Sequence, residues 1–430
     1  MTPIIGTRIN QRLFFLALLC FAFTSFVYAR KRSSQQGSAS PRRSAVSAPS
    51  QDGLQIQFAF QGNVVQVPAQ IADALPLVPV RINGSQPSWF LLDTARANSA
   101  IDDVRAVAVG LYSPSAEGTL PKSFSNVTLE FPGLKISLPS LALDSFGDLS
   151  ARIGHVVQGV LGEDVLSRLV LKIDYQAPSV QFYDPQGFKY GGRGLQVPLQ
   201  ISGGIPAIAG KVAVKHRGKF IGLMAIATAQ TEPLAFSPHF AAGHSFSELS
   251  ERMLPLPGAD AASDTDVREF LGRVQELQFG KIGFADPIAI FPVKSAKGPG
   301  IVPSEFVCAI GGEVLSRFSA ILNYPAHLLI LEPNQTFPDV FTADMSGLTI
   351  IAIPPAFDKF EVAQVARKSP AAAAHIEIGD MIQKIDDRPA SDYNLDEIRE
   401  LLRQSGIAHK LSFLHNGKPF DVTLTLKPLV

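Results

Sequence analysis

The stretch VLGEDVLSRLVLKIDY, Val160 to Tyr175, decides the fold because it occurs twice. About 150 residues later AIGGEVLSRFSAILNY, Ala309 to Tyr324, keeps its glycine, its Val-Leu-Ser-Arg block and its final tyrosine. In both copies an apolar run ends at the glycine, a short block follows, and a second apolar run leads to the tyrosine. Such self-similarity predicts two structurally equivalent halves in one chain.

A second pair of equivalent segments lies upstream of the repeated block. LLDTARA, Leu91 to Ala97, aligns with AIATAQT, Ala225 to Thr231. In the first copy an apolar run, Phe90 to Leu92, ends directly at Asp93. A carboxylate behind a buried strand costs free energy unless hydrogen bonds or a chemical role compensate for it. Asp93 is therefore the first candidate for a functional residue.

Length and composition limit the class of protein. The chain has 430 residues, more than one hydrophobic core usually supports, so several domains are expected. Basic and acidic residues number 38 each, which indicates no basic surface for nucleic acid. Short apolar runs separated by Gly, Pro, Asn and Ser from about residue 54 to 331 predict many short strands. The eight histidines have no metal-site spacing, so neither a metal nor a cofactor is expected.

The N-terminal segment has the pattern of an export signal. Two arginines precede the apolar run LFFLALLCFAFTSFVYA, and its last three residues fit a signal peptidase site. We expect a signal peptide over residues 1–29 and export to the periplasm or out of the cell. The alternative is an uncleaved anchor, the one route to a membrane, since 17 residues nearly match the roughly 20 that span a bilayer. Residues 30–52, rich in Ser, Gln, Pro and Arg, predict a disordered linker.

The C-terminal segment has the pattern of a third compact unit. In VAQVARKSPAAAAHIEIGDMIQKIDDRPA, Val362 to Ala390, a serine and a proline suit the N-cap and first residue of a short helix. Asn394 caps a second helix, and one face of that helix contains Leu395, Ile398 and Leu402. These three residues either belong to the core or line a binding groove, and the sequence leaves both readings open.

The two β-rich halves resemble aspartic peptidases of the pepsin and retropepsin type, and the C-terminal unit resembles a bacterial PDZ domain. The marks are Asp93-Thr94, the repeated glycine and Leu-Ser-Arg block, and the Ser-Pro-Ala and Gly-Asp-x-Ile phrases. The resemblance covers about residues 54–430. It implies a mainly β fold with two aspartic-peptidase-like β-barrel lobes, residues 53–200 and a degenerate 201–340, followed by an α+β PDZ domain, residues 341–430.

In that family each lobe contributes one Asp-Thr/Ser-Gly turn, and the two carboxyl groups share a proton. The resemblance makes Asp93 the first catalytic aspartate, Thr94 the residue whose hydroxyl holds the turns together, and Ala95 the occupant of the glycine position. In the second turn Ala227 replaces the aspartate, while Thr228 keeps the threonine. Because the residues of a catalytic unit act together, the loss of one acid can remove most of the rate.

Two functions therefore stay open. The first is an aspartic-type endopeptidase acting on polypeptide substrates. Its missing acid would come from a second chain in a homodimer, from Glu232, or from a rearranged site. The second is a catalytically inactive pseudopeptidase that binds peptides or partner proteins without cutting them. The residues themselves favour the second, because only one of the two acids is present.

The PDZ resemblance implies that a peptide adds as a strand to an exposed sheet edge. The receiving strand would contain Leu348 and Ile350, and the backbone N–H groups around Gly347 and Leu348 would bind a C-terminal carboxylate. The helix face of Leu395, Ile398 and Leu402 would line the pocket. The chain itself ends at the apolar Val430, so its tail is also a candidate ligand for the groove of a neighbouring molecule.

Overall fold

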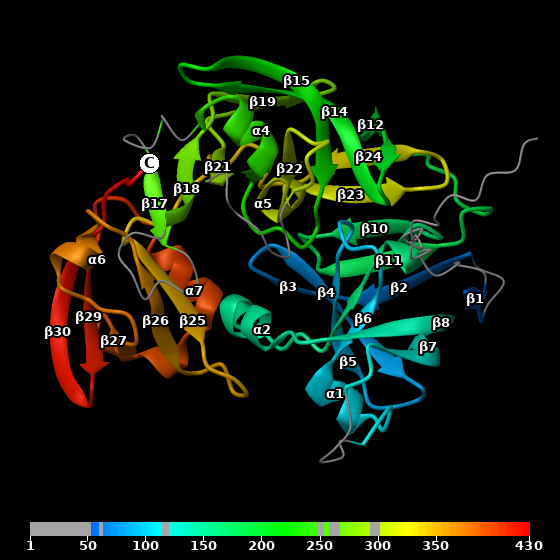
Figure 1. Cartoon of the computed structure of the whole chain (residues 1–430), viewed down its shortest axis with the longest axis horizontal. Coiled ribbons are helices and arrows are strands. Elements are labelled where there is room, and N and C mark those ends of the chain that lie inside the picture. Colours follow the sequence, from blue (N-terminus) through cyan, green and yellow to red (C-terminus); the bar gives the residue numbers. More distant parts are fainter. Residues whose placement is uncertain are drawn as a thin grey trace, which may run out of the picture. The chain divides into compact units, whose positions relative to one another are not determined.

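The computed structural model describes residues 53–59, 63–113, 120–246, 249, 253–257, 267–292 and 302–430. The predicted signal peptide and linker, residues 1–52, lie outside these ranges and stay predictions. β-Strands far outweigh helices in the described chain (Figure 1), so the mainly β fold expected from the sequence is confirmed. None of the helices in these ranges is long and apolar enough to cross a membrane.

The first half of the chain forms an eight-stranded sheet. Its strands, in sheet order, are β1 (Gln55–Phe58), β8 (Leu134–Asp144), β6 (Ala100–Asp102), β9 (Gly159–Leu161), β5 (Ser88–Leu92), β4 (Leu75–Ile82) and β3 (Gln70–Ala72), while β7 (Ser123–Phe131) pairs with β4 and β8. The helices are α1 (Asp103–Ala108), α2 (Gly147–Ile153) and α3 (Glu163–Leu166). Strands β5 and β9 run parallel, so their C-terminal ends lie side by side.

The second half forms a ten-stranded sheet with the same central arrangement. Its strands, in sheet order, are β17 (Leu254–Pro257), β18 (Val267–Arg273), β21 (Ile288–Pro292), β16 (Leu234–Phe236), β22 (Cys308–Ile310), β15 (Gly218–Ile226), β14 (Ile205–Val214), β19 (Glu276–Phe279) and β20 (Ile282–Ala285), and β13 (Gln200–Ser202) pairs with β14. The helices are α4 (Pro238–Gly243) and α5 (Gly312–Leu315). Strands β15 and β22 run parallel, as β5 and β9 do.

A six-stranded sheet joins the two halves. Its order is β12 (Leu195–Pro198), β24 (Leu328–Pro333), β23 (Phe318–Asn323), β10 (Val170–Asp174), β11 (Ser179–Tyr183) and β2 (Val64–Pro68). The central strands β10 and β23 are the apolar runs that follow the two Leu-Ser-Arg blocks, and they pair antiparallel so that Lys172 lies opposite Ile321. These two residues are equivalent in the repeat, so the two halves are related by an approximate two-fold axis through this pair.

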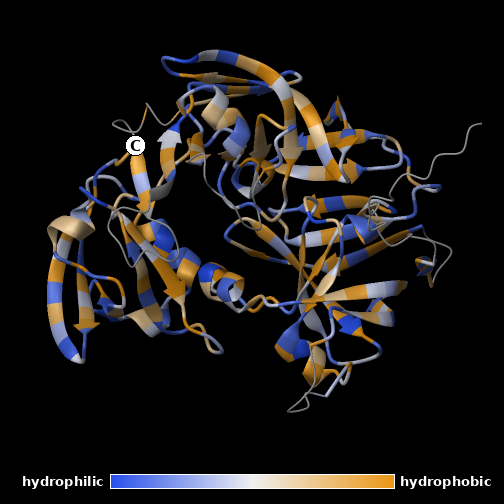
Figure 2. Cartoon of the chain, in the orientation of Figure 1, coloured by the Kyte–Doolittle hydropathy of each residue, from blue (hydrophilic) through white to orange (hydrophobic). Residues whose placement is uncertain are grey.

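The C-terminal unit has a sheet and a hydrophobic core of its own. Its strands are β25 (Leu348–Ala352), β26 (Phe360–Val365), β27 (Met381–Ile385), β29 (Ala408–His415) and β30 (Lys418–Thr425), and β28 (Arg388–Pro389) pairs with β27. The helices are α6 (Pro370–Ala373), the 3₁₀ turn η2 (Ala390–Asp392) and α7 (Leu395–Leu401). Apolar and polar residues alternate along β30 (Figure 2), as expected for a strand with one face on a core. The first and second halves of the chain share one large hydrophobic core.

Arg317, from the second Leu-Ser-Arg block, holds the segment that leads to the C-terminal unit. Its side chain is 4% exposed, and its guanidinium donates hydrogen bonds to the carbonyl groups of Thr336 and Asp339. The same guanidinium lies 3.8 Å from the ring centroid of Phe341, a cation–π contact. The repeated arginine therefore has a structural role in this copy.

The chain end does not leave the molecule. Val430 packs against the large core, and the Nε of Arg273 donates a hydrogen bond of 3.2 Å to the Val430 carbonyl. That the tail enters the groove of a neighbouring molecule stays a prediction, and in this structure the terminal residue contacts its own chain instead. The physical reason is that an apolar terminal residue finds a partner surface within its own chain.

Candidate active site

The two candidate turns occupy equivalent positions at the ends of equivalent strands. Asp93 follows β5, and its backbone N–H donates to the carbonyl of Leu161 at 3.0 Å. Ala227 follows β15, and its N–H donates to the carbonyl of Ile310, also at 3.0 Å. The two turns that were aligned from the sequence therefore occupy equivalent positions in the folded chain.

The threonines of the two turns bind each other reciprocally. The Thr94 N–H donates to the Thr228 Oγ1 and the Thr228 N–H donates to the Thr94 Oγ1, both at 3.2 Å. The Thr94 hydroxyl donates to the carbonyl of Ile226 at 2.5 Å, and the Thr228 hydroxyl donates to that of Leu92 at 2.6 Å. Both side chains are fully buried. This is the contact between turns that the pepsin-type resemblance implies.

The carboxyl group of Asp93 is held by its own turn. The Ala95 N–H donates to Asp93 Oδ1 at 2.9 Å. Burial raises the pKa of Asp93, while the hydrogen bond from Ala95 and the positive charge of Arg96 oppose that rise. Neither Ala95 nor Ala229 has a positive φ, so alanine fits where the family has glycine.

The glycines of the repeated blocks are required by close packing behind the two turns. A Cβ at Gly162 would lie 2.7 Å from the carbonyl carbon of Asn98. A Cβ at Gly311 would lie 2.1 Å from the carbonyl oxygen of Glu232. Real Cβ atoms do not approach backbone so closely, so each block needs glycine where it meets its own turn.

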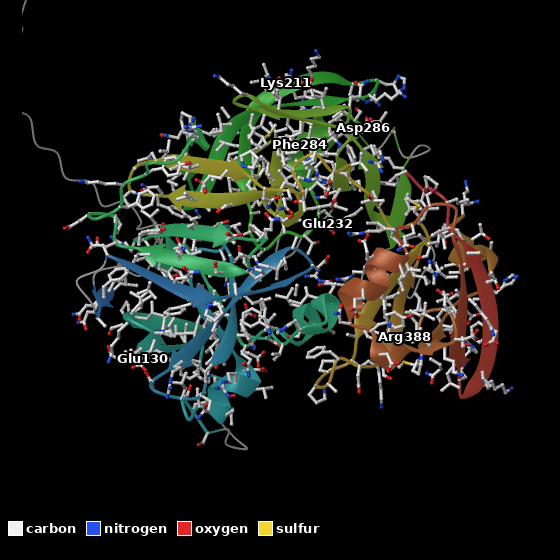
Figure 3. All side chains as sticks on the ribbon, turned by 180° about the vertical axis from the view of Figure 1, so that it is seen from behind. Glu130, Lys211, Glu232, Phe284, Asp286 and Arg388 are labelled. Atoms are coloured by element: carbon white, nitrogen blue, oxygen red, sulfur yellow. The ribbon has the colours of Figure 1, made fainter. Side chains whose placement is uncertain are left out.

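Asp93 has no second carboxylate beside it in the described part of the chain. The Ala227 side chain, 6% exposed, belongs to a small hydrophobic cluster, and Arg96 is the charged side chain that acts on the pKa of Asp93. Glu232 (Figure 3) accepts a hydrogen bond from the side chain of Gln230, and its charge acts on the pKa values of Glu269 and Glu313 instead. Glu232 is therefore not a displaced substitute for the missing aspartate.

One residue near Asp93 escaped the sequence interpretation. The Tyr324 side chain is buried, its hydroxyl has no hydrogen-bond partner, and its pKa is raised by burial and by the charges of Glu163 and Asp93. The repeat does contain a signal for it, because Tyr324 is the last residue of the second copy and matches Tyr175. Its hydroxyl stays protonated and cannot replace the missing carboxyl group.

A cavity borders the second turn, from Ala229 to Pro233, and Asp93 is not among its lining residues. It has a volume of about 570 Å³ and reaches Gly347, Leu348 and Leu402 of the C-terminal unit. Glu313, from α5, faces this cavity, and burial raises its pKa to about 7.

The acid of the first half that is equivalent to Glu313 is Asp164, and it receives hydrogen bonds that Glu313 does not. Asp164 accepts hydrogen bonds from the Ser99 N–H and from the Ser99 hydroxyl, the latter at 2.7 Å. The residue that corresponds to Ser99 in the second half is Pro233, which has neither donor. Glu313 therefore lacks the two donors that stabilise the charge of Asp164.

The loop before β25 makes a left-handed turn that packs closely against the start of α6. Gly347 has φ +81°, and a Cβ there would lie 2.2 Å from the Cβ of Ser369. Ser369 in turn caps α6 by accepting a hydrogen bond of 3.2 Å from the Ala372 N–H. Asn394 caps α7 in a capping box with Glu397.

Comparison with protein-family models matches a PDZ domain over residues 348–413. The C-terminal unit is a PDZ domain. No curated protein matches the chain. Among solved structures, an aspartic proteinase from Irpex lacteus has a TM-score of 0.39 at 12% identity, covering 64% of this chain and 99% of that one. Basic 7S globulin from soybean has a TM-score of 0.35 at 10% identity, covering 65% and 97%.

The PDZ domain does not present its loop amides to a ligand as the sequence suggested. The N–H groups of Ser346 and Gly347 donate to the carboxylate of Asp344, at 3.0 and 2.6 Å, and the Leu348 N–H donates to the Ser346 Oγ at 3.0 Å. The expected capture of a terminal carboxylate by these groups does not fit this arrangement. Burial raises the pKa of Asp344 to about 6.

The apolar face of α7, for which the sequence allowed either a core or a groove role, is part of the PDZ core. Leu395, Ile398 and Leu402 are each at most 2% exposed and pack with Leu348 and Ile350. Of the three, only Leu402 also borders the cavity. The residues of α7 itself that line the cavity are charged: Asp396, Arg399 and Glu400.

Proposed function

We propose that the chain is an exported, aspartic-peptidase-like protein that binds polypeptides and does not cleave them by the two-carboxyl mechanism. The observation that carries this proposal is the pair of equivalent turns, in which Ala227 occupies the position that Asp93 has in the first turn. Export is supported by the apolar run and cleavage site of residues 1–29.

The chemistry of peptide hydrolysis explains why one acid is insufficient. One carboxylate must remove a proton from the attacking water while another carboxyl group protonates the scissile carbonyl. Asp93, with its raised pKa, can give or accept a proton but cannot do both at once. The methyl group of Ala227 contributes neither function.

Binding without cleavage is supported by the parts that remain. The reciprocal hydrogen bonds of Thr94 and Thr228 keep the two halves joined at the turns, where a two-lobed protein of this type holds an extended chain. The PDZ domain adds a second element, since such domains bind peptide ligands. Polypeptide is the ligand class common to both.

The alternative function is a peptidase that obtains its second acid from another copy of the chain. Two observations favour it: the intact hydrogen bonds between the turns and the raised pKa of Asp93. A group with a raised pKa is common at catalytic sites, although burial alone also produces one. A homodimer of this kind would have activity that depends on protein concentration.

Cleavage of fluorescein-labelled casein between pH 3 and 7 separates the two functions. We expect no cleavage above background by the wild type, and an acid-optimum activity in Ala227→Asp that is lost again in Ala227→Asp/Asp93→Ala. Ala229→Asp is the matched control, because it adds a carboxylate to the same turn two residues away. Cleavage by the wild type that Asp93→Ala abolishes would establish the peptidase instead.

A further inference from the structure

The first half of the chain contacts the strand of the PDZ domain that a peptide ligand would join. Strand β25 is the edge strand of its sheet, pairing with β26 within the described residues. Helix α2 packs against this strand. At the C-terminal end of α2, Gly154 adopts φ +68°, and a Cβ there would lie 2.7 Å from the Cβ of Leu395 in α7. The end of α2 therefore lies against both β25 and α7, the two walls of a PDZ groove.

Arg399 of α7 stabilises the contact between the PDZ domain and the first half of the chain. Its guanidinium donates a hydrogen bond to the backbone carbonyl of Arg152, in the last turn of α2. It also forms an ion pair of 3.1 Å with Asp73, in the turn between β3 and β4, and both side chains are about one-fifth exposed. A cation at a helix C-terminus is favourable because unpaired carbonyl groups point outward there.

A backbone contact adds to this stabilisation. The Asp73 N–H donates to Asp396 Oδ2 at 3.1 Å. Asp73 has φ +50°, so the β3–β4 turn directs both its amide and its carboxylate toward α7. Two segments of the first half, the β3–β4 turn and α2, thus bind the same helix of the PDZ domain.

Helix α2 is connected directly to the strand that ends at Asp93. After α2 the chain passes through Gln158, whose N–H donates to the carbonyl of Trp89 in β5 at 2.8 Å, while its carbonyl accepts from the Asp102 N–H at 3.0 Å. The chain then enters β9, which pairs with β5. Helix α2 is thus joined through Gln158 to the strand pair that positions Asp93.

We propose that α2 is a built-in occupant of the PDZ groove, which a polypeptide ligand must displace before it can add to β25. The Asp344 carboxylate, bound to the loop amides, occupies the other end of the same site. The inference rests on the proposed peptide binding only for the identity of the ligand class. The occupant competes at the effective concentration of a tethered segment, on the order of millimolar.

The test uses the full chain and a fluorescein-labelled synthetic copy of residues 146–158 as the probe. Asp73→Ala removes the ion pair that joins the β3–β4 turn to Arg399 and changes no residue of α2, β25 or α7, so it weakens the attachment of the first half while the probe keeps its own contact residues. The matched control is Asp286→Ala (Figure 3), because Asp286 has φ +49° in another turn and carries the same backbone strain on substitution. Asp73→Asn also removes the charge, and asparagine tolerates a positive φ better than alanine does. This variant therefore separates the loss of the ion pair from backbone strain.

We expect the probe to bind Asp73→Ala about tenfold more tightly than the wild type, which is what a charged hydrogen bond of about 1.4 kcal/mol is worth. Asp73→Asn should change in the same direction, and Asp286→Ala should match the wild type. Equal affinity for all four proteins, or no binding to any of them, would overturn the proposal.

Hydrogen exchange provides a readout that does not depend on a ligand. In Asp73→Ala the amides of α2 and of β25 should exchange faster together, by about the same tenfold factor. Faster exchange of one without the other would show that α2 does not cover the strand. Casein cleavage by the wild type would refute the proposed function while leaving both of these results unchanged.

Discussion

Replacing Thr228 by valine tests the joint between the two turns. The substitution keeps the shape of the side chain but removes the hydroxyl that donates to the Leu92 carbonyl and accepts from the Thr94 N–H. Both groups lie beside fully buried side chains, so water cannot replace the hydroxyl. Each unsatisfied buried group costs about 1–3 kcal/mol, so the free energy of unfolding should fall by about 2–6 kcal/mol.

Guanidinium unfolding followed by circular dichroism measures this loss. Thr423→Val is the control, because Thr423 is exposed on β30 and its hydroxyl can exchange its partners for water. Thr94→Val should cost a similar amount, since its contacts mirror those of Thr228. The double variant should cost clearly less than the sum of the two singles, because both belong to one network.

A loss below about 0.5 kcal/mol for both single variants would refute this reasoning. Strict additivity in the double variant would also contradict it, since the two hydroxyls would then act independently.

Three further predictions concern stability. Burial raises the pKa of Glu313 to about 7, so the folded state binds this proton more tightly than the unfolded state does. The free energy of unfolding should therefore fall as the pH rises from about 4.5 to 7. Glu313→Gln should remove much of this fall, as measured by thermal melts at pH 5 and 8. Gly311→Ala should lower the midpoint of thermal unfolding strongly, while Gly379→Ala, which meets no atom within 4 Å, should show only the cost of its positive φ. Arg317→Lys should speed proteolysis near Asp339, because lysine cannot keep the guanidinium hydrogen bonds to the carbonyl groups of Thr336 and Asp339. Arg388→Lys (Figure 3) should not change this rate.

Much of the fold follows from patterns that are local in the sequence. The repeated block predicts two equivalent halves, and the pairing of Lys172 with Ile321 has the symmetry that the repeat requires. The caps Ser369 and Asn394 begin helices where the sequence places them, because an N-cap needs only its own next few residues. The turns at Asp93 and Ala227 follow from the apolar runs that precede them.

The prediction for the loop amides before β25 failed because these amides have a local partner that competes with a ligand. Asp344 lies two and three residues before the amides that were expected to bind a terminal carboxylate, and it binds them itself. The pattern Asp-x-Ser-Gly contains this signal, since aspartate commonly accepts hydrogen bonds from the amides that follow it. For Val430, by contrast, no local pattern indicates that Arg273 holds it.

The sequence by itself determined which elements form, where the two turns lie, and that one of them lacks its acid, because strand periodicity, helix caps and the identity of residue 227 are properties of short segments. Only the tertiary structure decided that Arg399 meets Asp73 and that α2 packs against β25, since these groups are hundreds of residues apart in the chain. Such contacts depend on how complete surfaces fit together once each core has formed. No short segment contains that information.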